Sequence, residues 1–256
     1  DALTTGTSNT GLGYNSGSSI TTASQSTLVG ANAGTNITTG SDNTAYGYDA
    51  LRSCVTGIQN TALGRSALQN HTGNTAVAIG QSALFNNQTA ANTAVGYAAG
   101  HDNTTGGSLT FMGYQAGYNN TTGSNNTGIG HATLQNNETG GNNTALGTYT
   151  LTNTTGSDNT ALGYYSQYST TSGARNTSLG SATLYNNTTA TNNTALGYNA
   201  MAVSTTGSSN TAVGAYALDS NTTGAANNAH GSGSLSRITT GNYNSGFGNE
   251  TLESAT

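Results

Sequence analysis

The side chains that could perform acid–base or metal chemistry are few and widely separated. The four histidines, His71, His101, His131 and His230, are at least 30 residues apart, so no two have the spacing of metal ligands. The acidic residues are equally dispersed, so no pair suits general acid and base roles: Asp42, Asp49, Asp102, Glu138, Asp158, Asp219, Glu250 and Glu253. No nucleophile, base and orienting group occur together. We therefore predict no catalytic residue, no metal site, no cofactor and no enzyme activity.

Two further chemical signals are weak. Cys54 is the only cysteine and has no disulfide partner within the chain. Four segments that match the N-glycosylation motif begin at Asn36, Asn70, Asn137 and Asn221, but a repeat rich in Asn and Thr produces this motif by chance.

The composition excludes several classes of partner. Charged residues make up 5% of the chain, there is no Lys, and the net charge is −5, so we expect no basic patch for nucleic acid or anionic lipid. No apolar run approaches the roughly 18 residues that span a bilayer, so we expect no membrane insertion. The chain begins at Asp1 rather than Met. We interpret it as a mature fragment or a segment of a longer protein.

One glycine recurs along the whole chain, within near-copies of Asn-Thr-Ala-Leu-Gly. Its positions are 13, 30, 47, 64, 80, 96, 113, 130, 147, 163, 180, 197, 214, 231 and 248, at intervals of 16 or 17 residues. We call these the landmark glycines, and each stretch from one of them to the next a rung. A fixed period over a full chain is typical of one unit stacked on itself. We therefore predict a single array over residues 1–256.

Aligning the rungs on the landmark glycine gives columns of similar residues. The residue before the glycine is apolar, and we predict a structural core ladder there: Leu63, Ile79, Val95, Ile129, Leu146, Leu162, Leu179, Leu196 and Val213. Thr stands two residues before this column and Ala lies between them. Alternation of this kind predicts a short strand with Thr and Leu on one face and Ala and Gly on the other. A second apolar column, including Leu51, Leu68 and Leu84, follows the glycine by four residues.

Each rung then runs through Asn and Thr into Thr-Thr-Gly, which predicts a second strand ending in a turn. Two short strands and two turns in 16–17 residues describe one coil of a parallel β-solenoid, so the predicted fold is all-β with about 15 rungs. We expect stacked Asn amides to hydrogen-bond from rung to rung. The predicted turn glycines are Gly47, Gly64, Gly80, Gly96, Gly113, Gly130, Gly147, Gly163, Gly180, Gly197 and Gly214.

Each rung offers only about two large apolar side chains, a thin core for one chain. Partners can supply the remaining burial. Because the Ala and Gly face is narrow, we expect it to pack around a symmetry axis in a homotrimer.

These motifs resemble known fibre proteins. Asn-Thr-Ala-Leu-Gly followed by Tyr-x-Ala-Leu, as in residues 47–51, resembles the head repeats of trimeric autotransporter adhesins and the shaft repeats of phage tail-fibre-like surface proteins. The adhesin heads share a core sequence of the type Ser-Val-Ala-Ile-Gly, and residues 75–80 match it most closely. The resemblance implies a left-handed parallel β-roll, three chains per fibre, and attachment or display at a cell or virion surface. The rungs here are longer than those of the adhesin heads.

Aromatic residues give a third signal. Tyr48, Tyr97, Tyr114, Tyr164 and Tyr198 directly follow a landmark glycine, and we predict either a cover over a sheet edge or a tentative surface contact to a receptor or glycan. His230 stands in the apolar column. Leu109, Phe111 and Met112 place bulk in other columns, which indicates local repacking or a lateral contact.

Two functions fit these observations. The first is a structural and adhesive shaft segment of an extracellular trimeric fibre, whose receptor or glycan is bound by a tip outside this chain. The second is an ice-binding β-solenoid, in which stacked Thr ladders order water.

Overall fold

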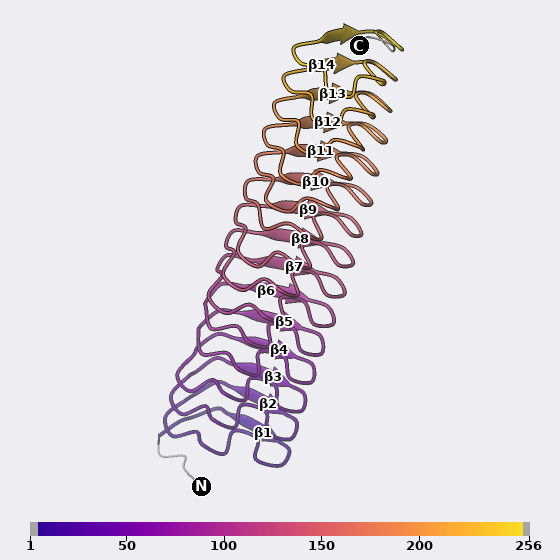
Figure 1. Ribbon diagram of the computed structural model, residues 1–256. Coiled ribbons are helices and arrows are strands. Elements are labelled where there is room, and N and C mark those ends of the chain that lie inside the picture. Colours follow the sequence, from indigo (N-terminus) through magenta and orange to yellow (C-terminus); the bar gives the residue numbers. More distant parts are fainter. Residues whose placement is uncertain (1–4, 253–256) are drawn as a thin grey trace. The chain divides into compact units, whose positions relative to one another are not determined.

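The computed structural model describes residues 5–252 and consists of two compact units, unit 1 (Asp1–Asn126) and unit 2 (Thr127–Thr256). Both units are built from short strands joined by turns, and no helix occurs in the described range. Each unit is a parallel β-solenoid whose strands succeed one another rung by rung (Figure 1). The predicted all-β solenoid is therefore confirmed.

Every strand has three residues. Unit 1 contains β1 (Thr10–Leu12), β2 (Thr27–Val29), β3 (Thr44–Tyr46), β4 (Thr61–Leu63), β5 (Val77–Ile79), β6 (Thr93–Val95) and β7 (Thr110–Met112). Unit 2 contains β8 (Thr127–Ile129), β9 (Thr144–Leu146), β10 (Thr160–Leu162), β11 (Thr177–Leu179), β12 (Thr194–Leu196), β13 (Thr211–Val213), β14 (Asn228–His230) and β15 (Ser245–Phe247). Within each unit neighbouring strands pair parallel and in register, so equal repeat positions lie above one another.

The second strand that we predicted at Thr-Thr-Gly is a series of bends in the structure. The carbonyl of Thr38 accepts hydrogen bonds from the N–H groups of Thr21, Thr22 and Ala23, at 3.0, 3.2 and 3.2 Å. One acceptor that serves three consecutive donors cannot continue as the evenly spaced ladder of a parallel sheet. The rungs are nevertheless joined here, because the Thr21 hydroxyl also donates to the Thr38 carbonyl, at 3.1 Å.

The predicted core ladder was placed on the wrong side of the strand. The middle residue of each strand, usually Ala, is buried inside the coil, while its apolar neighbour points outward and is half-buried or exposed. Side chains alternate along a strand, so burying Ala forces the next residue out. The residues that lie on the outer face are therefore Leu63, Ile79, Val95, Ile129, Leu146, Leu162, Leu179, Leu196 and Val213.

The second apolar column fills the interior instead. Nine of its members are fully buried, and only Leu252, at the end of the described range, is exposed. We call the buried members the inner Leu column: Leu51, Leu68, Leu84, Leu134, Leu151, Leu184, Met201, Leu218 and Leu235. They adopt left-handed backbone conformations with φ between 48° and 54°, which are unusual for residues other than Gly, Asn and Asp. This conformation turns the side chain into the coil, opposite the small Ala of the strand.

In two places a large side chain replaces the small strand Ala, and Gly replaces the large residue of the inner Leu column on either side of it. Leu28 replaces the strand Ala in β2, and both flanking positions of the inner Leu column are then glycine, Gly17 and Gly34. A Cβ on either glycine would lie 2.8 Å from a methyl group of Leu28. Phe111 in β7 is flanked in the same way by Gly100 and Gly117. The unusual bulk of this rung is thus a repacking of the interior, in which Phe111 is fully buried.

Buried Asn side chains join the rungs in two columns. In the first, four residues before the landmark glycine, Asn43 Oδ1 accepts the backbone N–H of Asn60 at 3.0 Å, and Asn43 Nδ2 donates to the Gly57 carbonyl at 2.8 Å. The bonds here run mainly from side chain to backbone, rather than from amide to amide as we had predicted. Amide-to-amide bonds between rungs also occur in a second column, seven residues after the glycine, which we call the inner polar column. There Asn120 Nδ2 donates to Asn103 Oδ1 at 2.9 Å.

Candidate interaction surface

The outward side of the strands presents two parallel columns in each unit, which together we call the outer sheet face. The first residue of each strand, usually Thr, forms one column, and the third residue, usually apolar, forms the other. Exposed large side chains of the second column include Leu63 and Leu179, both 45% exposed, and Ile79 at 36%. An apolar stripe on an otherwise polar surface is typical of an interaction site.

The longest uninterrupted run of the Thr column lies in unit 2, before Asn228 and Ser245 replace Thr in β14 and β15. Six consecutive strands begin with Thr, and every one of these side chains is half-buried or exposed: Thr127, Thr144, Thr160, Thr177, Thr194 and Thr211. In unit 1 Val77 interrupts the column. The outer sheet face therefore combines a nearly uniform hydroxyl-bearing column with an apolar column of variable size, which contains Tyr46, Met112, His230 and Phe247.

The five predicted surface tyrosines are all exposed: Tyr48, Tyr97, Tyr114, Tyr164 and Tyr198. Tyr97 and Tyr114 occupy adjacent rungs and stack with ring centroids 5.1 Å apart and planes at 13°. Stacked rings cover each other's faces and leave their edges outward. Because each ring shields one face of the other, the stack favours the interpretation as a cover over the sheet edge for this pair.

A larger aromatic cluster in unit 2 escaped the sequence analysis. Tyr149 stacks on Tyr165 at 5.2 Å, Tyr168 stacks on Tyr185 at 5.5 Å, and Tyr164 meets Tyr165 edge to face at 4.2 Å. A hydrogen bond with the Tyr164 side chain is the main reason that the pKa of Tyr165 lies above its ordinary value. Each stacked pair occupies one repeat column, two residues after the landmark glycine for Tyr149 and Tyr165 and five residues after it for Tyr168 and Tyr185, so the alignment on the landmark glycine contained this signal.

The histidines occupy four unrelated environments. His71 is fully buried in the inner polar column, with Nε2 3.0 Å from Asn60 Oδ1 and Nδ1 3.0 Å from Asn87 Nδ2. Nδ1 also lies 3.1 Å from the backbone carbonyl oxygen of Asn87. Burial lowers the pKa of the imidazole below its ordinary value of 6.5, which favours the neutral ring. The other three contact aromatic rings in the described range: His101 stacks on Phe85 and Tyr118, His131 meets Tyr149 edge to face, and His230 stacks on Phe247.

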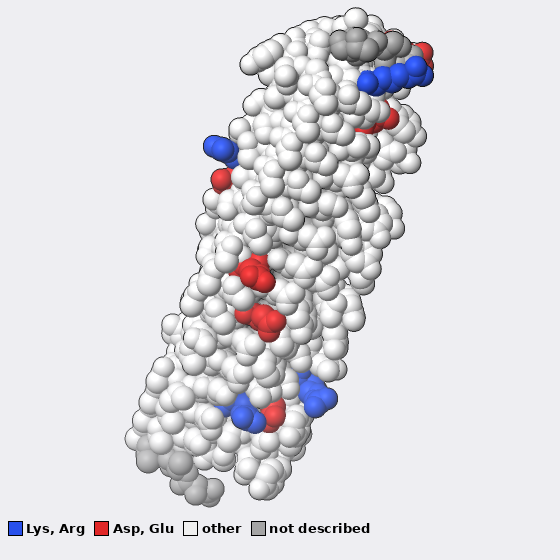
Figure 2. Space-filling view, viewed as in Figure 1, with Lys and Arg blue, Asp and Glu red and all other residues white. Residues whose placement is uncertain are grey.

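Charged groups are sparse in both units. Figure 2 shows isolated acidic and basic side chains on a surface of mostly uncharged residues. Arg52 and Asp49 form one ion pair, at 3.4 Å, and His101 Nδ1 lies 2.7 Å from Asp102 Oδ1. Within residues 5–252 no three His, Cys, Asp or Glu side chains are placed to hold a metal ion.

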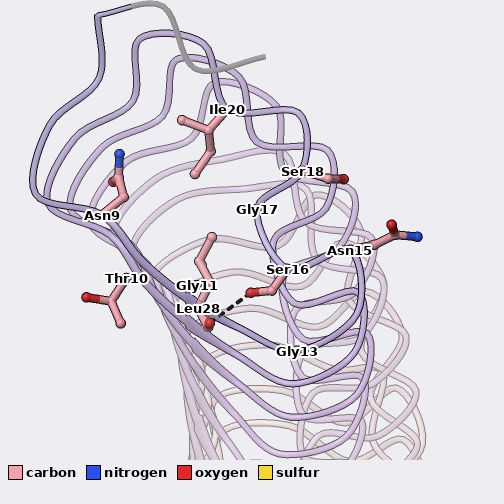
Figure 3. A pocket seen from close by; sticks show the side chains of 10 residues that line it. All are labelled: Asn9, Thr10, Gly11, Gly13, Asn15, Ser16, Gly17, Ser18, Ile20 and Leu28. Atoms are coloured by element: carbon pink, nitrogen blue, oxygen red, sulfur yellow. Dashed lines mark hydrogen bonds between the residues drawn. The ribbon is translucent and has the colours of Figure 1, made fainter. Parts of the chain in front are cut away.

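A hollow of about 490 Å³ opens into the coil at β1 in unit 1 (Figure 3). Its lining carries no titratable side chain: Asn9, Thr10, Gly11, Gly13, Asn15, Ser16, Gly17, Ser18, Ile20 and Leu28. The Ser16 hydroxyl donates to the Leu28 carbonyl at 2.8 Å, and no base lies beside it in this lining. The lining of the hollow therefore offers no acid or base for catalysis.

The glycosylation motifs differ in accessibility. Asn137 and Asn221 are fully buried in the inner polar column, where their side chains bond to the carbonyls of Gly140 and Gly224. A glycosyltransferase therefore has no access to either side chain in the folded chain. Asn36 is exposed and Asn70 is half-buried.

The part of the chain that the structure describes contains no helix of the length and apolarity needed to cross a membrane. The outer sheet face is thus the most extensive candidate site in both units. Comparison of the chain with protein-family models, with curated proteins and with solved structures finds no match.

Proposed function

We propose that this chain is a non-catalytic structural segment of an extracellular homotrimeric fibre at a cell or virion surface. The observation that carries the proposal is the apolar column of the outer sheet face, which continues from strand to strand within each unit. Apolar side chains repeated along one side of a coil gain most by packing against the same column of another chain, as in a symmetric oligomer. The resemblance of the repeat to those of trimeric fibre proteins supports three chains per fibre and a left-handed coil.

The Ala and Gly face has no role in this assembly. Ala62, Ala94 and Ala195 are 0–1% exposed and lie inside the coil, so they cannot pack around a symmetry axis as we had expected. The proposed axis instead faces the apolar column of the outer sheet face. The receptor or glycan of the fibre binds, in this proposal, at a tip outside this chain.

The mass of the protein in solution tests the proposal. We expect a trimer by sedimentation equilibrium at micromolar concentration, and dissociation of the double variant Leu179→Ser, Leu196→Ser with an unchanged circular dichroism spectrum. The matched control is Val203→Ser, Tyr243→Ser, because these exposed side chains lie outside the outer sheet face. A monomeric wild-type protein, or equal dissociation by both double variants, would refute the trimer.

Ice binding is the second candidate function, and the six consecutive outward Thr residues of unit 2 favour it. Rungs repeat at about 4.8 Å, which gives the hydroxyl groups a regular spacing. The neighbouring apolar column is irregular in size, and Phe247 and His230 project from it. Because ordered water needs a regular template, we expect no thermal hysteresis at millimolar protein concentration. If the wild-type protein shows measurable thermal hysteresis and Thr177→Tyr abolishes it, ice binding becomes the better supported function.

A further inference from the structure

Five tyrosines on the surface of unit 2 form one connected group, which we call the tyrosine cluster. They come from three successive rungs: Tyr149 from the first, Tyr164, Tyr165 and Tyr168 from the second, and Tyr185 from the third. The ring of Tyr165 contacts the other four, at centroid distances from 4.2 to 5.8 Å. Tyr164 is 53% exposed and the other four side chains are half-buried, so each of them remains accessible from solvent.

The coil does not need these rings for its packing. Two residues after the landmark glycine, where Tyr149 and Tyr165 lie, other rungs of unit 2 carry Ala182 and Asn199. Five residues after the glycine, where the other stacked pair lies, another rung carries Ala202. These rungs form the same strands and turns with small side chains. The concentration of phenol groups in neighbouring rungs therefore calls for an explanation other than the fold.

Two common kinds of covalent cross-link are closed to this chain. A disulfide within the chain requires two cysteines, and Cys54 is the only one. An amide cross-link between side chains requires Lys, which the chain lacks. Tyr, by contrast, occurs 14 times. A phenol that loses one electron and one proton becomes a radical, and two such radicals couple covalently when their rings meet.

Two pairs within the tyrosine cluster already bring phenol rings of neighbouring rungs together. Tyr149 and Tyr165 stack with centroids 5.2 Å apart and planes at 8°, and Tyr168 and Tyr185 stack at 5.5 Å and 17°. Tyr165 and Tyr168 meet edge to face at 5.0 Å within one rung. Rings at these separations are in direct contact. Holding two reactants in contact replaces a bimolecular encounter by a unimolecular step, which favours coupling within the cluster over coupling between molecules.

We propose that the tyrosine cluster is a site of oxidative cross-linking, at which a one-electron oxidant that consumes hydrogen peroxide links Tyr149 to Tyr165 and Tyr168 to Tyr185. Each phenol gives up one electron and one proton, and the two radicals form a carbon–carbon bond between ring carbons next to the hydroxyl groups. The hydrogen atom on each joined carbon then moves to the phenolic oxygen, which restores both aromatic rings. The two electrons and two protons reduce one molecule of hydrogen peroxide to two molecules of water.

The two links would join three successive rungs covalently. This modification lies within one chain, so it goes beyond the proposed fibre function and does not depend on a trimer. Because a cross-link that closes a loop lowers the entropy of the unfolded chain, the oxidised protein should melt at a higher temperature than the untreated protein.

Oxidation of the full chain by a haem peroxidase and hydrogen peroxide tests the proposal. We expect dityrosine fluorescence in a product that still migrates as a single chain on a denaturing gel. After peptic digestion, mass spectrometry should find linked peptides that carry Tyr149 with Tyr165, or Tyr168 with Tyr185. Each linked pair should be lighter than the sum of its two peptides by two hydrogen atoms.

The double variant Tyr165→Phe, Tyr168→Phe keeps both rings but removes one phenol from each stacked pair. It should lose most of the dityrosine fluorescence, and the remainder should come from the stacked Tyr97 and Tyr114 of unit 1. The matched control is Tyr14→Phe, Tyr243→Phe. It removes two phenols that are 75% and 85% exposed and that have no ring contact within residues 5–252, and it should keep the fluorescence.

The concentration dependence separates contact within the cluster from random encounter. Links between rungs of one chain should form to the same extent per chain when the protein is diluted a hundredfold. The proposal is wrong if dilution abolishes the links, or if the control variant rather than the cluster variant loses the fluorescence, because exposure rather than ring contact would then decide which tyrosines couple.

Discussion

The ring of Phe111 fills the space beside Gly117, where a Cβ would overlap its ring atoms. Gly117 belongs to the next rung, whereas Gly100 belongs to the rung of Phe111, and a Cβ on Gly100 would lie 3.2 Å from a carbon of the same ring. One large side chain in the strand thus replaces two members of the inner Leu column.

This relationship predicts a rescue. Phe111→Ala should lower the free energy of unfolding by about 3–5 kcal/mol, because it leaves a cavity between two glycines. Adding Gly100→Leu and Gly117→Leu restores the arrangement of the other rungs and should recover at least half of that loss. Gly117→Leu alone should destabilise the protein, because it clashes with the ring. Urea unfolding of the four proteins measures these differences, and additive effects would contradict the proposed contact.

The buried His71 predicts a pH dependence of stability. Its lowered pKa means that the folded state binds fewer protons than the unfolded state between that pKa and 6.5. The free energy of unfolding should therefore decrease as the pH falls through this window and level off below the lowered pKa. The control is His71→Asn, which matches the Asn at the same position in the next rung. In urea titrations between pH 4.5 and 7.5, the free energy of unfolding of His71→Asn should lack the decrease caused by His71. The other three histidines are present in both proteins, so their effect on the pH dependence cancels in the comparison. Identical pH profiles would contradict the assignment of a neutral buried ring.

Cys54 should be unreactive in the folded protein. Its side chain is fully buried, and burial raises the pKa of the thiol above its ordinary value of 9.0, so little thiolate forms and little of it is accessible. A thiol reagent at pH 8 should label the protein only at the rate of unfolding. The half-buried neighbour Ser53 provides the control, because Cys54→Ile, Ser53→Cys should react rapidly. Rapid labelling of wild-type Cys54 would contradict the burial.

The landmark glycines should tolerate no side chain. Gly96 has φ of 139°, and a Cβ there would overlap the carbonyl oxygen of Gly113 in the next rung. We expect Gly96→Ala to lower the free energy of unfolding by more than about 4 kcal/mol. Gly107→Ala is the matched control, because nothing lies within 4 Å of its Cβ position, and its effect should stay within about 0.5 kcal/mol. Similar unfolding curves for both variants would be inconsistent with this packing.

The sequence predicted the stacking of equal positions, because a fixed period leaves few other ways to bury recurring apolar columns. It did not predict which column lies inside. Leu63 and Leu68 are both members of apolar columns, and the column of Leu63 is the more regular one. The burial of Leu68 instead follows from its left-handed backbone, a conformation that Leu seldom adopts. One signal in the sequence could have identified the inner column. Where Leu28 replaces the strand Ala, Gly replaces Leu at both neighbouring positions of the inner Leu column. Such a paired change in size indicates that the strand Ala and the inner Leu column are in contact.

The candidate surface was predictable only in part. The tyrosines that follow landmark glycines are exposed, as their regular spacing indicated, but the contact of Tyr168 with Tyr165 joins two different columns. Their proximity depends on where each turn directs its side chains, and that depends on positive φ values at residues such as Tyr149 and Tyr165. Such values are common for Gly or Asn in turns but cannot be anticipated for Tyr.

The left-handed residues have a consequence for how the array assembles. A rung such as residues 47–63 holds Asp49, Leu51 and Gln59 in conformations that an isolated peptide of this sequence would seldom visit. Only an already folded neighbour offers the carbonyls and the interior surface that make these conformations favourable. Folding should therefore begin with a slow, improbable seed of adjoining coils and then extend quickly by addition at an existing edge, much as a crystal grows from its faces.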